Sequence, residues 1–137
     1  PAAPPAPADP KALETWRERL RERIRKGVQG GEKPLASLSF TGPARVTAAD
    51  AQGLTAVLGG TSSAAIAWSQ LRPADWLALA RAFAKEGIAA DHATLAFFLM
   101  AEGQTKAAEE ELARAAGSDP KQGPALADEV RAAFKPR

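Results

Sequence analysis

The chain contains few side chains that could carry out catalysis, and they do not form a catalytic set. It has no cysteine and no tyrosine, and its only histidine is His92. The absence of cysteine excludes disulfides, iron–sulfur clusters and thiolate zinc sites, and one histidine cannot supply a multi-histidine metal site. His92 follows Asp91 at the expected start of a helix, where we interpret it as a surface or packing residue. We therefore predict no enzyme activity, no bound cofactor and no metal site.

Two polar clusters could still suggest chemistry. Three consecutive glutamates occupy positions 109–111, within about one helical turn of Lys106 and Arg114. No histidine or second carboxylate cluster accompanies them in the sequence, so a cation would lack ligands, and we predict a solvated helix face. The segment from Gly59 to Ser63 lacks the lysine and the following helix of a phosphate-binding loop. We predict a hairpin turn there.

A basic segment is the remaining candidate for binding chemistry. Residues 10–28 contain seven basic and three acidic side chains, a net charge of +4, whereas the whole chain has a net charge of +2. Arginines recur at four-residue steps and share one helix face: Arg17, Arg21 and Arg25. Such a stripe can contact nucleic-acid phosphates or an anionic membrane surface. A glutamate three residues before each arginine instead favours ordinary ion pairs, in a solvated helix that packs on its own domain or self-associates.

This basic segment is predicted to be a helix over residues 10–28. Asp9 is a suitable N-cap, Pro10 a suitable first residue, and glycines end the run. Its apolar residues form one stripe: Leu13, Trp16, Leu20 and Ile24. So short a stripe needs a cover, because isolated helices of this length are marginal in water. We expect the chain's own β-sheet to cover Trp16, with a second copy or a partner protein as the alternative.

The remaining sequence predicts an α+β fold. Apolar and polar residues alternate between residues 36 and 71, and turn signals interrupt them, which indicates three or four short antiparallel strands in a meander. A sheet this small needs helices over one face. From residue 73 to residue 134 the apolar spacing is helical, and we predict a cluster of four helices, one of them capped by Asp91. Residues 36–137 are predicted to form a single domain.

Aromatic residues recur at spacings typical of core positions, and we expect them to join the sheet to the helices: Trp68, Trp76, Phe83, Phe97 and Phe98. Adjacent residues on a helix cannot face the same way. One of Phe97 and Phe98 is therefore expected to be exposed, which makes this pair the best candidate for an interface. Together with the basic helix, the predicted partner surface comprises Trp16, Arg17, Arg21, Arg25, Phe97 and Phe98.

The segment 89–122 resembles a tetratricopeptide repeat, a helix–turn–helix unit. The matching residues are Leu95, Ala96, Leu99, Gly103, Ala108, Leu112, Ala115 and Pro120. His92 stands near the place of the family's first-helix aromatic. The resemblance covers about a quarter of the chain as a single copy. It implies a role in protein–protein contact without placing any peptide-clamping residue.

These observations predict a non-catalytic interaction or scaffolding module. Residues 1–9, PAAPPAPAD, read as an extended Pro/Ala-rich linker, and a chain that begins with Pro1 is expected to be a piece of a larger, bacterial-looking multidomain protein. No signal peptide or transmembrane segment is evident, so the cytoplasm is the default location. The alternatives are a nucleic-acid-binding accessory domain that uses the arginine-rich helix, and a regulatory segment attached to an upstream enzyme.

Overall fold

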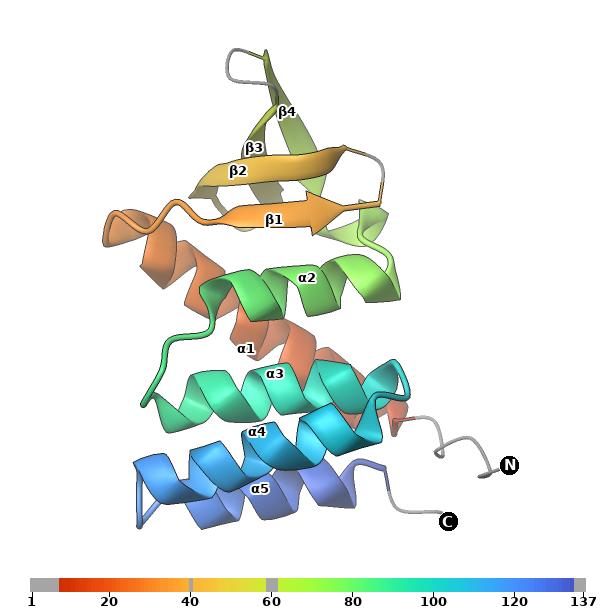
Figure 1. Ribbon diagram of the computed structural model, residues 1–137. Helices are drawn as coiled ribbons and strands as arrows, with labels where there is room; N and C mark the ends of the chain where they lie inside the picture. Colours follow the sequence, from red (N-terminus) through yellow and green to blue (C-terminus); the bar gives the residue numbers. More distant parts are fainter. Residues whose placement is uncertain (1–7, 40, 59–61, 135–137) are drawn as a thin grey trace. The chain divides into compact units, whose positions relative to one another are not determined.

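The computed structural model describes residues 8–39, 41–58 and 62–134, and these residues have an α+β fold (Figure 1). The chain begins with helix α1 (Pro10–Gln29) and continues with strands β1 (Leu35–Leu38), β2 (Gly42–Ala49), β3 (Gly53–Leu58) and β4 (Ser62–Ala67). A 3₁₀ turn, η1 (Trp68–Gln70), precedes helices α2 (Pro73–Phe83), α3 (Ala89–Ala101), α4 (Thr105–Ser118) and α5 (Gly123–Ala132). The predicted order of one helix, a small antiparallel meander and four helices is confirmed. The predicted linker, apart from its last two residues, and the turn at 59–61 lie outside the described residues.

The chain divides into two compact units. Unit 1 comprises residues 1–19 and 84–137, and unit 2 comprises residues 20–83. Helix α1 thus contributes its first half to unit 1 and its second half to unit 2. The predicted boundary between the basic helix and a domain over 36–137 does not coincide with this division.

Unit 2 contains a four-stranded antiparallel sheet in the order β1-β2-β3-β4, in which each strand pairs with the next along the chain. The register places Val46 opposite Ala56 and Leu54 opposite Ile66, and all four side chains are buried. Side chains alternate between the two faces of a strand, so the residues between them point outward. An irregularity between Val46 and Ala48 shifts the register of β2 against β3. The predicted period-two pattern therefore corresponds to one buried and one exposed face.

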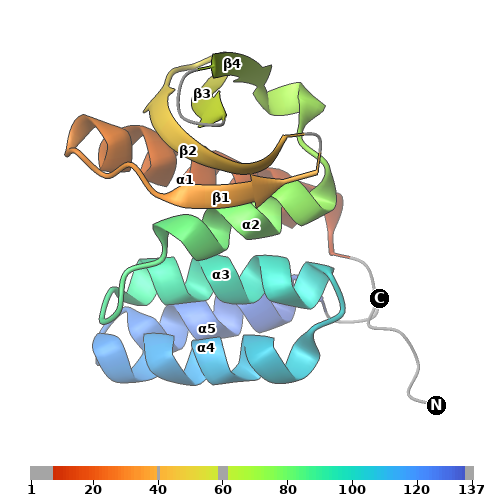
Figure 2. The same ribbon diagram turned by 45° about the horizontal axis from the view of Figure 1, so that its top comes forward.

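Helix α2 lies along strand β1 (Figure 2). A buried carboxylate connects the two elements. Asp75, in the first turn of α2, is 1% exposed. Its Oδ1 accepts a hydrogen bond from the Ser39 backbone N–H at 2.7 Å, and its Oδ2 accepts from the Ser39 hydroxyl and the Arg72 N–H, each at 2.9 Å. Asp75 therefore satisfies an amide at the start of its own helix and holds the end of β1 at the same time.

The aromatic residues of unit 2 join the sheet segment to α2, as predicted. The rings of Trp68 and Trp76 stack with their centroids 6.0 Å apart. The indole N–H of Trp68 donates to the Asp50 carbonyl oxygen at 3.0 Å, so the buried ring leaves no polar atom unpaired. This stack fixes the turn that leads from β4 into α2.

Unit 1 contains a helical hairpin formed by α3 and α4, with α5 packed against both helices (Figure 2). The turn between α3 and α4 contains Gly103 at φ +79°, a conformation that favours glycine. Small side chains from both helices are fully buried and allow close approach: Ala96, Ala108 and Ala115. The hairpin geometry matches the predicted helix–turn–helix, and its relation to tetratricopeptide repeats stays a prediction.

The cover over Trp16 differs from the prediction. Trp16 is 1% exposed, and its ring stacks on Phe97 of α3 with the centroids 5.4 Å apart. Phe97 also contacts Phe134 and Phe98, with centroid distances of 5.2 and 5.1 Å. The expectation that the β-sheet covers Trp16 is therefore wrong. A helix packs against Trp16 because α3 presents an aromatic side chain at that point.

The start of α3 also differs from the prediction. The helix begins at Ala89 with Ile88 as its N-cap, and α2 ends at Phe83. Asp91 is therefore in the first turn instead of the cap position, and its carboxylate accepts a hydrogen bond from the Lys85 N–H at 3.0 Å. An acidic side chain is favourable both at the N-cap and in the first turn of a helix, which explains why the sequence pattern misplaced the start of α3.

Candidate functional site

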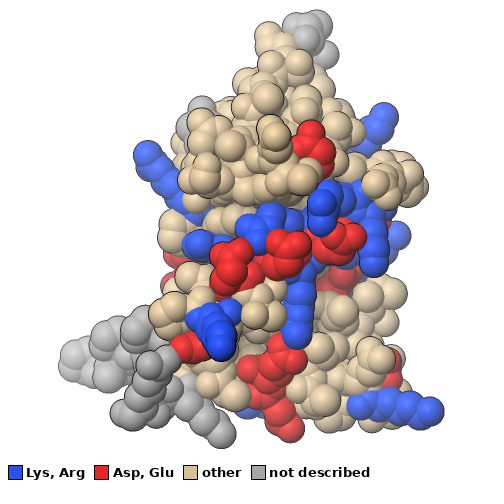
Figure 3. Space-filling view, turned by 180° about the vertical axis from the view of Figure 1, so that it is seen from behind, with Lys and Arg blue, Asp and Glu red and all other residues tan. Residues whose placement is uncertain are grey.

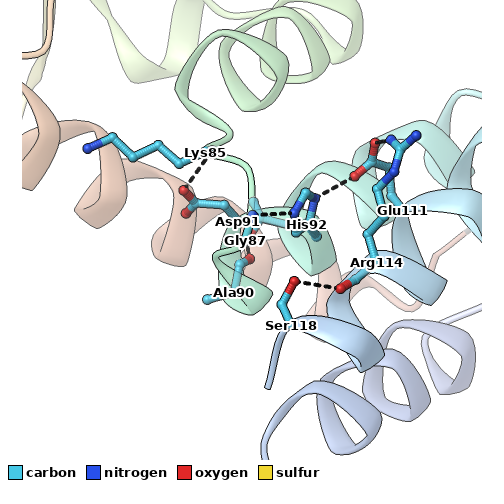
Figure 4. A network of polar contacts seen from close by, with 9 residues as sticks. Lys85, Gly87, Ala90, Asp91, His92, Glu111, Arg114 and Ser118 are labelled. Atoms are coloured by element: carbon cyan, nitrogen blue, oxygen red, sulfur yellow. Dashed lines mark hydrogen bonds and ion pairs between the residues drawn. The ribbon is translucent and has the colours of Figure 1, made fainter. Parts of the chain in front are cut away.

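His92 belongs to a buried polar network in unit 1 (Figure 4). The side chain is 3% exposed, and its Nδ1 lies 2.7 Å from Oε2 of Glu111 in α4. The other carboxylate oxygen of Glu111 accepts a hydrogen bond from Arg114 at 2.5 Å. On the opposite side of the ring, the Gly87 backbone N–H donates to Nε2 at 3.1 Å. The network connects the turn before α3 to the middle of α4.

The hydrogen bonds determine which nitrogen of His92 carries the proton. A backbone N–H can only donate, so Nε2 is an acceptor, and the proton of the ring is on Nδ1, where it is donated to Glu111. The Nε2 lone pair is thereby occupied by Gly87 and is not directed at a serine or threonine hydroxyl. The arrangement has the histidine and carboxylate of a catalytic triad, but a backbone amide stands where the nucleophile would be.

This network corrects one sequence-based expectation and agrees with another. Glu111 was predicted on a solvated face with its neighbours, yet it is buried and bonded to His92, 19 residues earlier in the sequence. His92 is a packing residue, one of the two predicted possibilities. Among the described residues, no group of three or more His, Asp or Glu side chains could hold a metal ion.

The arginines of α1 are engaged with carboxylates and aromatic rings. Arg21 lies over the ring of Trp76, with its guanidinium carbon 5.8 Å from the centroid, and Arg25 forms an ion pair with Glu22. Arg17 is half-buried. On the face that Figure 3 shows, positive and negative side chains are interleaved. The predicted glutamate–arginine pairing is confirmed for Glu22 and Arg25, and interleaved charges of this kind weaken the field that a phosphate backbone would meet.

Two other arginines of α1, Arg19 and Arg23, also contact carboxylates within their units. Arg19 pairs with Glu129 at 2.5 Å and lies 4.5 Å above the ring centroid of Trp16. Arg23 makes two hydrogen bonds to Glu32, at 3.0 and 3.1 Å, and a third to the Phe83 carbonyl oxygen at 2.9 Å. These contacts orient the helix within each unit.

The aromatic part of the predicted partner surface is buried. Phe97 is 0% exposed and Phe98 is 2% exposed, so the expectation that one of them faces solvent is wrong. The reason is that α3 is buried on every side from Asp91 to Met100, which removes the distinction between inner and outer positions. Trp16 lies in the same cluster. None of the three rings is available to a partner in this conformation.

An apolar groove in unit 2 is the strongest candidate for a binding site. It lies between β1 and α2, has a volume of about 470 Å³, and we call it the β1–α2 groove. Its lining residues are Leu35, Ala36, Ser37, Ala74, Leu77, Ala78, Arg81 and Ala82. Leu35 is 59% exposed. Among the described residues, the exposed large hydrophobic side chains are Leu35 and Ile88.

The shape of the groove follows from the sequence of α2. Positions 74, 77, 78 and 81 recur at helical spacing, so they form one stripe beside the core-facing stripe. Two of them are alanines, whose small side chains leave the helix surface hollow. Strand β1 begins at Leu35, one residue before the predicted start. Because side chains alternate along a strand and the neighbouring Ala36 is buried, Leu35 points outward.

Two features of the sequence point to this groove. Leu35 is out of phase with the buried residues of its strand, and α2 carries alanines on a face where a solvated helix would carry charges. The predicted partner residues Arg17, Arg21 and Arg25 do not line the groove.

The comparisons with known proteins identify no relative. No family model, no curated protein and no solved structure matches the chain. Function is therefore inferred from the residues themselves. None of the described helices is long and apolar enough to cross a membrane.

Proposed function

We propose that this chain is a non-catalytic protein-interaction module, part of a larger protein, which binds its partner at the β1–α2 groove. The observation that carries the proposal is the exposed Leu35 beside an apolar hollow of about 470 Å³. Burying a leucine side chain contributes about 1.5–3 kcal/mol, and a partner that covered Leu35 together with the adjoining apolar groove would gain this free energy.

The buried polar groups support the same reading. His92 is the only histidine of the chain, and its hydrogen bonds are directed to a glutamate and a backbone amide. A group engaged in this way holds helices together and does not present a proton to a substrate.

The nucleic-acid alternative rests on the arginine stripe of α1. Arg21 and Arg25 are engaged within unit 2 by an aromatic ring and a carboxylate. A phosphate backbone would have to compete with these contacts. If the stripe nevertheless binds DNA or RNA, affinity will fall steeply with salt, and the slope will decrease by about one for each arginine replaced.

The test uses a photoreactive amino acid incorporated at position 35 of the full-length protein in its native cell, with Ser63 on strand β4 as the matched exposed control position. We expect a discrete covalent adduct with one protein from position 35 and none from position 63. The purified partner should then bind the chain, and Leu35→Asp should weaken binding by about ten-fold or more. The absence of any adduct at position 35, or equal adducts from both positions, would contradict the proposal.

A further inference from the structure

The charge of unit 2 indicates the chemistry of its partner. Residues 20–83 contain eight basic and four acidic side chains, a net charge of +4, whereas the rest of the chain has a net charge of −2. The excess positive charge of the protein is therefore concentrated in the unit that contains the β1–α2 groove.

All four carboxylates of unit 2 are already engaged. Glu22 pairs with Arg25, and Glu32 pairs with Arg23. Asp50 accepts hydrogen bonds from two backbone amides in the turn between β2 and β3. Asp75 accepts three hydrogen bonds at the junction of β1 and α2. Each carboxylate of unit 2 therefore has a partner within the unit.

Five cations of unit 2 have no ion pair among the described residues: Lys26, Lys33, Arg45, Arg72 and Arg81. Three of them are at or near the groove. Arg81 lines the groove. Arg45 of β2 is the direct cross-strand partner of Leu35, so the side chains of Arg45 and Leu35 are on the same, outer face of the sheet. The Arg45 guanidinium donates to the Lys33 carbonyl oxygen at 2.6 Å, which places these two residues together at the start of β1.

The groove therefore combines an apolar floor with a cationic margin. Leu35, Leu77 and the alanines offer apolar surface, and no acidic side chain lines the groove. A nucleic acid is a poor fit because single-stranded bases bind by stacking on aromatic rings, and the groove has none. A small anion is a poor fit as well, since the lining lacks a buried polar group to hold it.

We propose, on the basis of the function proposed above, that the occupant of the β1–α2 groove is an acidic segment of another protein that inserts a large apolar side chain between carboxylates. The apolar residue covers Leu35 and Leu77. The carboxylates pair with Arg81 on one side and with Arg45 and Lys33 on the other. Complementary charge of this kind raises the association rate and excludes basic partners.

The experiment measures binding of three synthetic hexapeptides by backbone amide NMR of the intact chain. The first has Leu-Phe at its centre and two acidic residues on each side, the second replaces the acidic residues with lysine, and the third replaces Leu-Phe with Gly-Ser. We expect the first peptide to shift amides of β1 and α2 with a Kd of about 1 mM or tighter, and both others to bind about ten-fold more weakly.

Charge reversal of the protein provides the second measurement. Arg81→Glu should lower the affinity for the acidic peptide by about ten-fold and raise the affinity for the lysine peptide. Lys26→Glu is the matched control, because Lys26 is an exposed cation of unit 2 that does not line the groove, and it should change neither affinity by more than about two-fold. Circular dichroism melting curves of both variants should match that of the unchanged chain, since Arg81 is exposed.

The outcomes separate this inference from the proposed function. Equal binding of the acidic and the lysine peptides at the groove would overturn the acidic partner and leave the interaction module intact. No groove shifts with any peptide, together with no adduct from position 35 in cells, would overturn both. Amide shifts at the groove on addition of a DNA duplex would overturn the acidic segment and indicate DNA as the occupant. Self-association in sedimentation, with the same groove shifts as the chain concentration rises, would overturn it and indicate a second copy of the chain.

Discussion

The cover over Trp16 allows a quantitative test of how unit 1 is stabilised. Truncation of a fully buried tryptophan to alanine removes its apolar contacts and leaves a cavity, at a cost of about 3–5 kcal/mol. The stack on Phe97, with ring centroids 5.4 Å apart, is an aromatic pair of the kind that adds about 0.5–1.5 kcal/mol beyond burial. Trp16→Ala should therefore reduce the free energy of unfolding by several kcal/mol.

The assay is thermal and urea unfolding followed by circular dichroism. With an unfolding entropy of about 2.1 cal/mol/K per residue over the 137 residues, a loss of about 3–5 kcal/mol lowers Tm by about 10–17 °C. Arg19→Ala is the matched control, because it removes the cation over the Trp16 ring and the exposed pair with Glu129 while leaving the tryptophan buried. This control should cost about 1 kcal/mol or less.

The reasoning requires that the chain be monomeric before and after the change, since Phe97 of the same chain is the cover. A Tm within about 3 °C of the unchanged protein would refute it, as would a dimer in sedimentation that Trp16→Ala dissociates. In the second case the tryptophan would be covered by another molecule, and its substitution would act on association.

Three other substitutions test particular contacts by urea unfolding. Asp75→Ala should cost roughly 2–4 kcal/mol, because it leaves three donors at the β1–α2 junction without an acceptor, and a loss below about 1 kcal/mol would contradict the assigned role. Glu111→Gln should cost about 1–3 kcal/mol and Glu110→Gln, at the exposed neighbouring position, less than about 0.5 kcal/mol; equal costs would show that the buried network contributes nothing. Gly53→Ala should destabilise unit 2 by several kcal/mol, since its Cβ would lie 2.1 Å from the Ile66 carbonyl oxygen, and an unchanged unfolding midpoint would rule out that close approach.

Local patterns in the sequence determined most of the elements. The Asp9-Pro10 start of α1 is reproduced in the structure, where the Ala12 N–H donates to the Asp9 carboxylate at 3.2 Å. The period-two alternation predicted a meander, and the small residues around Gly103 predicted a helical hairpin. These features depend on interactions between residues within a few positions of each other, and so they can be read from the sequence.

The tertiary structure decided what covers each surface. Trp16 is 81 residues from the Phe97 ring that covers it, and Glu111 is bonded to a histidine in another helix, so neither partner can be identified from local spacing. Phe97 and Phe98 are both buried because α3 is enclosed on all sides, a property of its neighbours and not of its own pattern. The β1–α2 groove exists only where an outward leucine meets the alanine face of a helix 38 residues later. Long-range packing determines such surfaces because it decides which apolar side chains remain in contact with water.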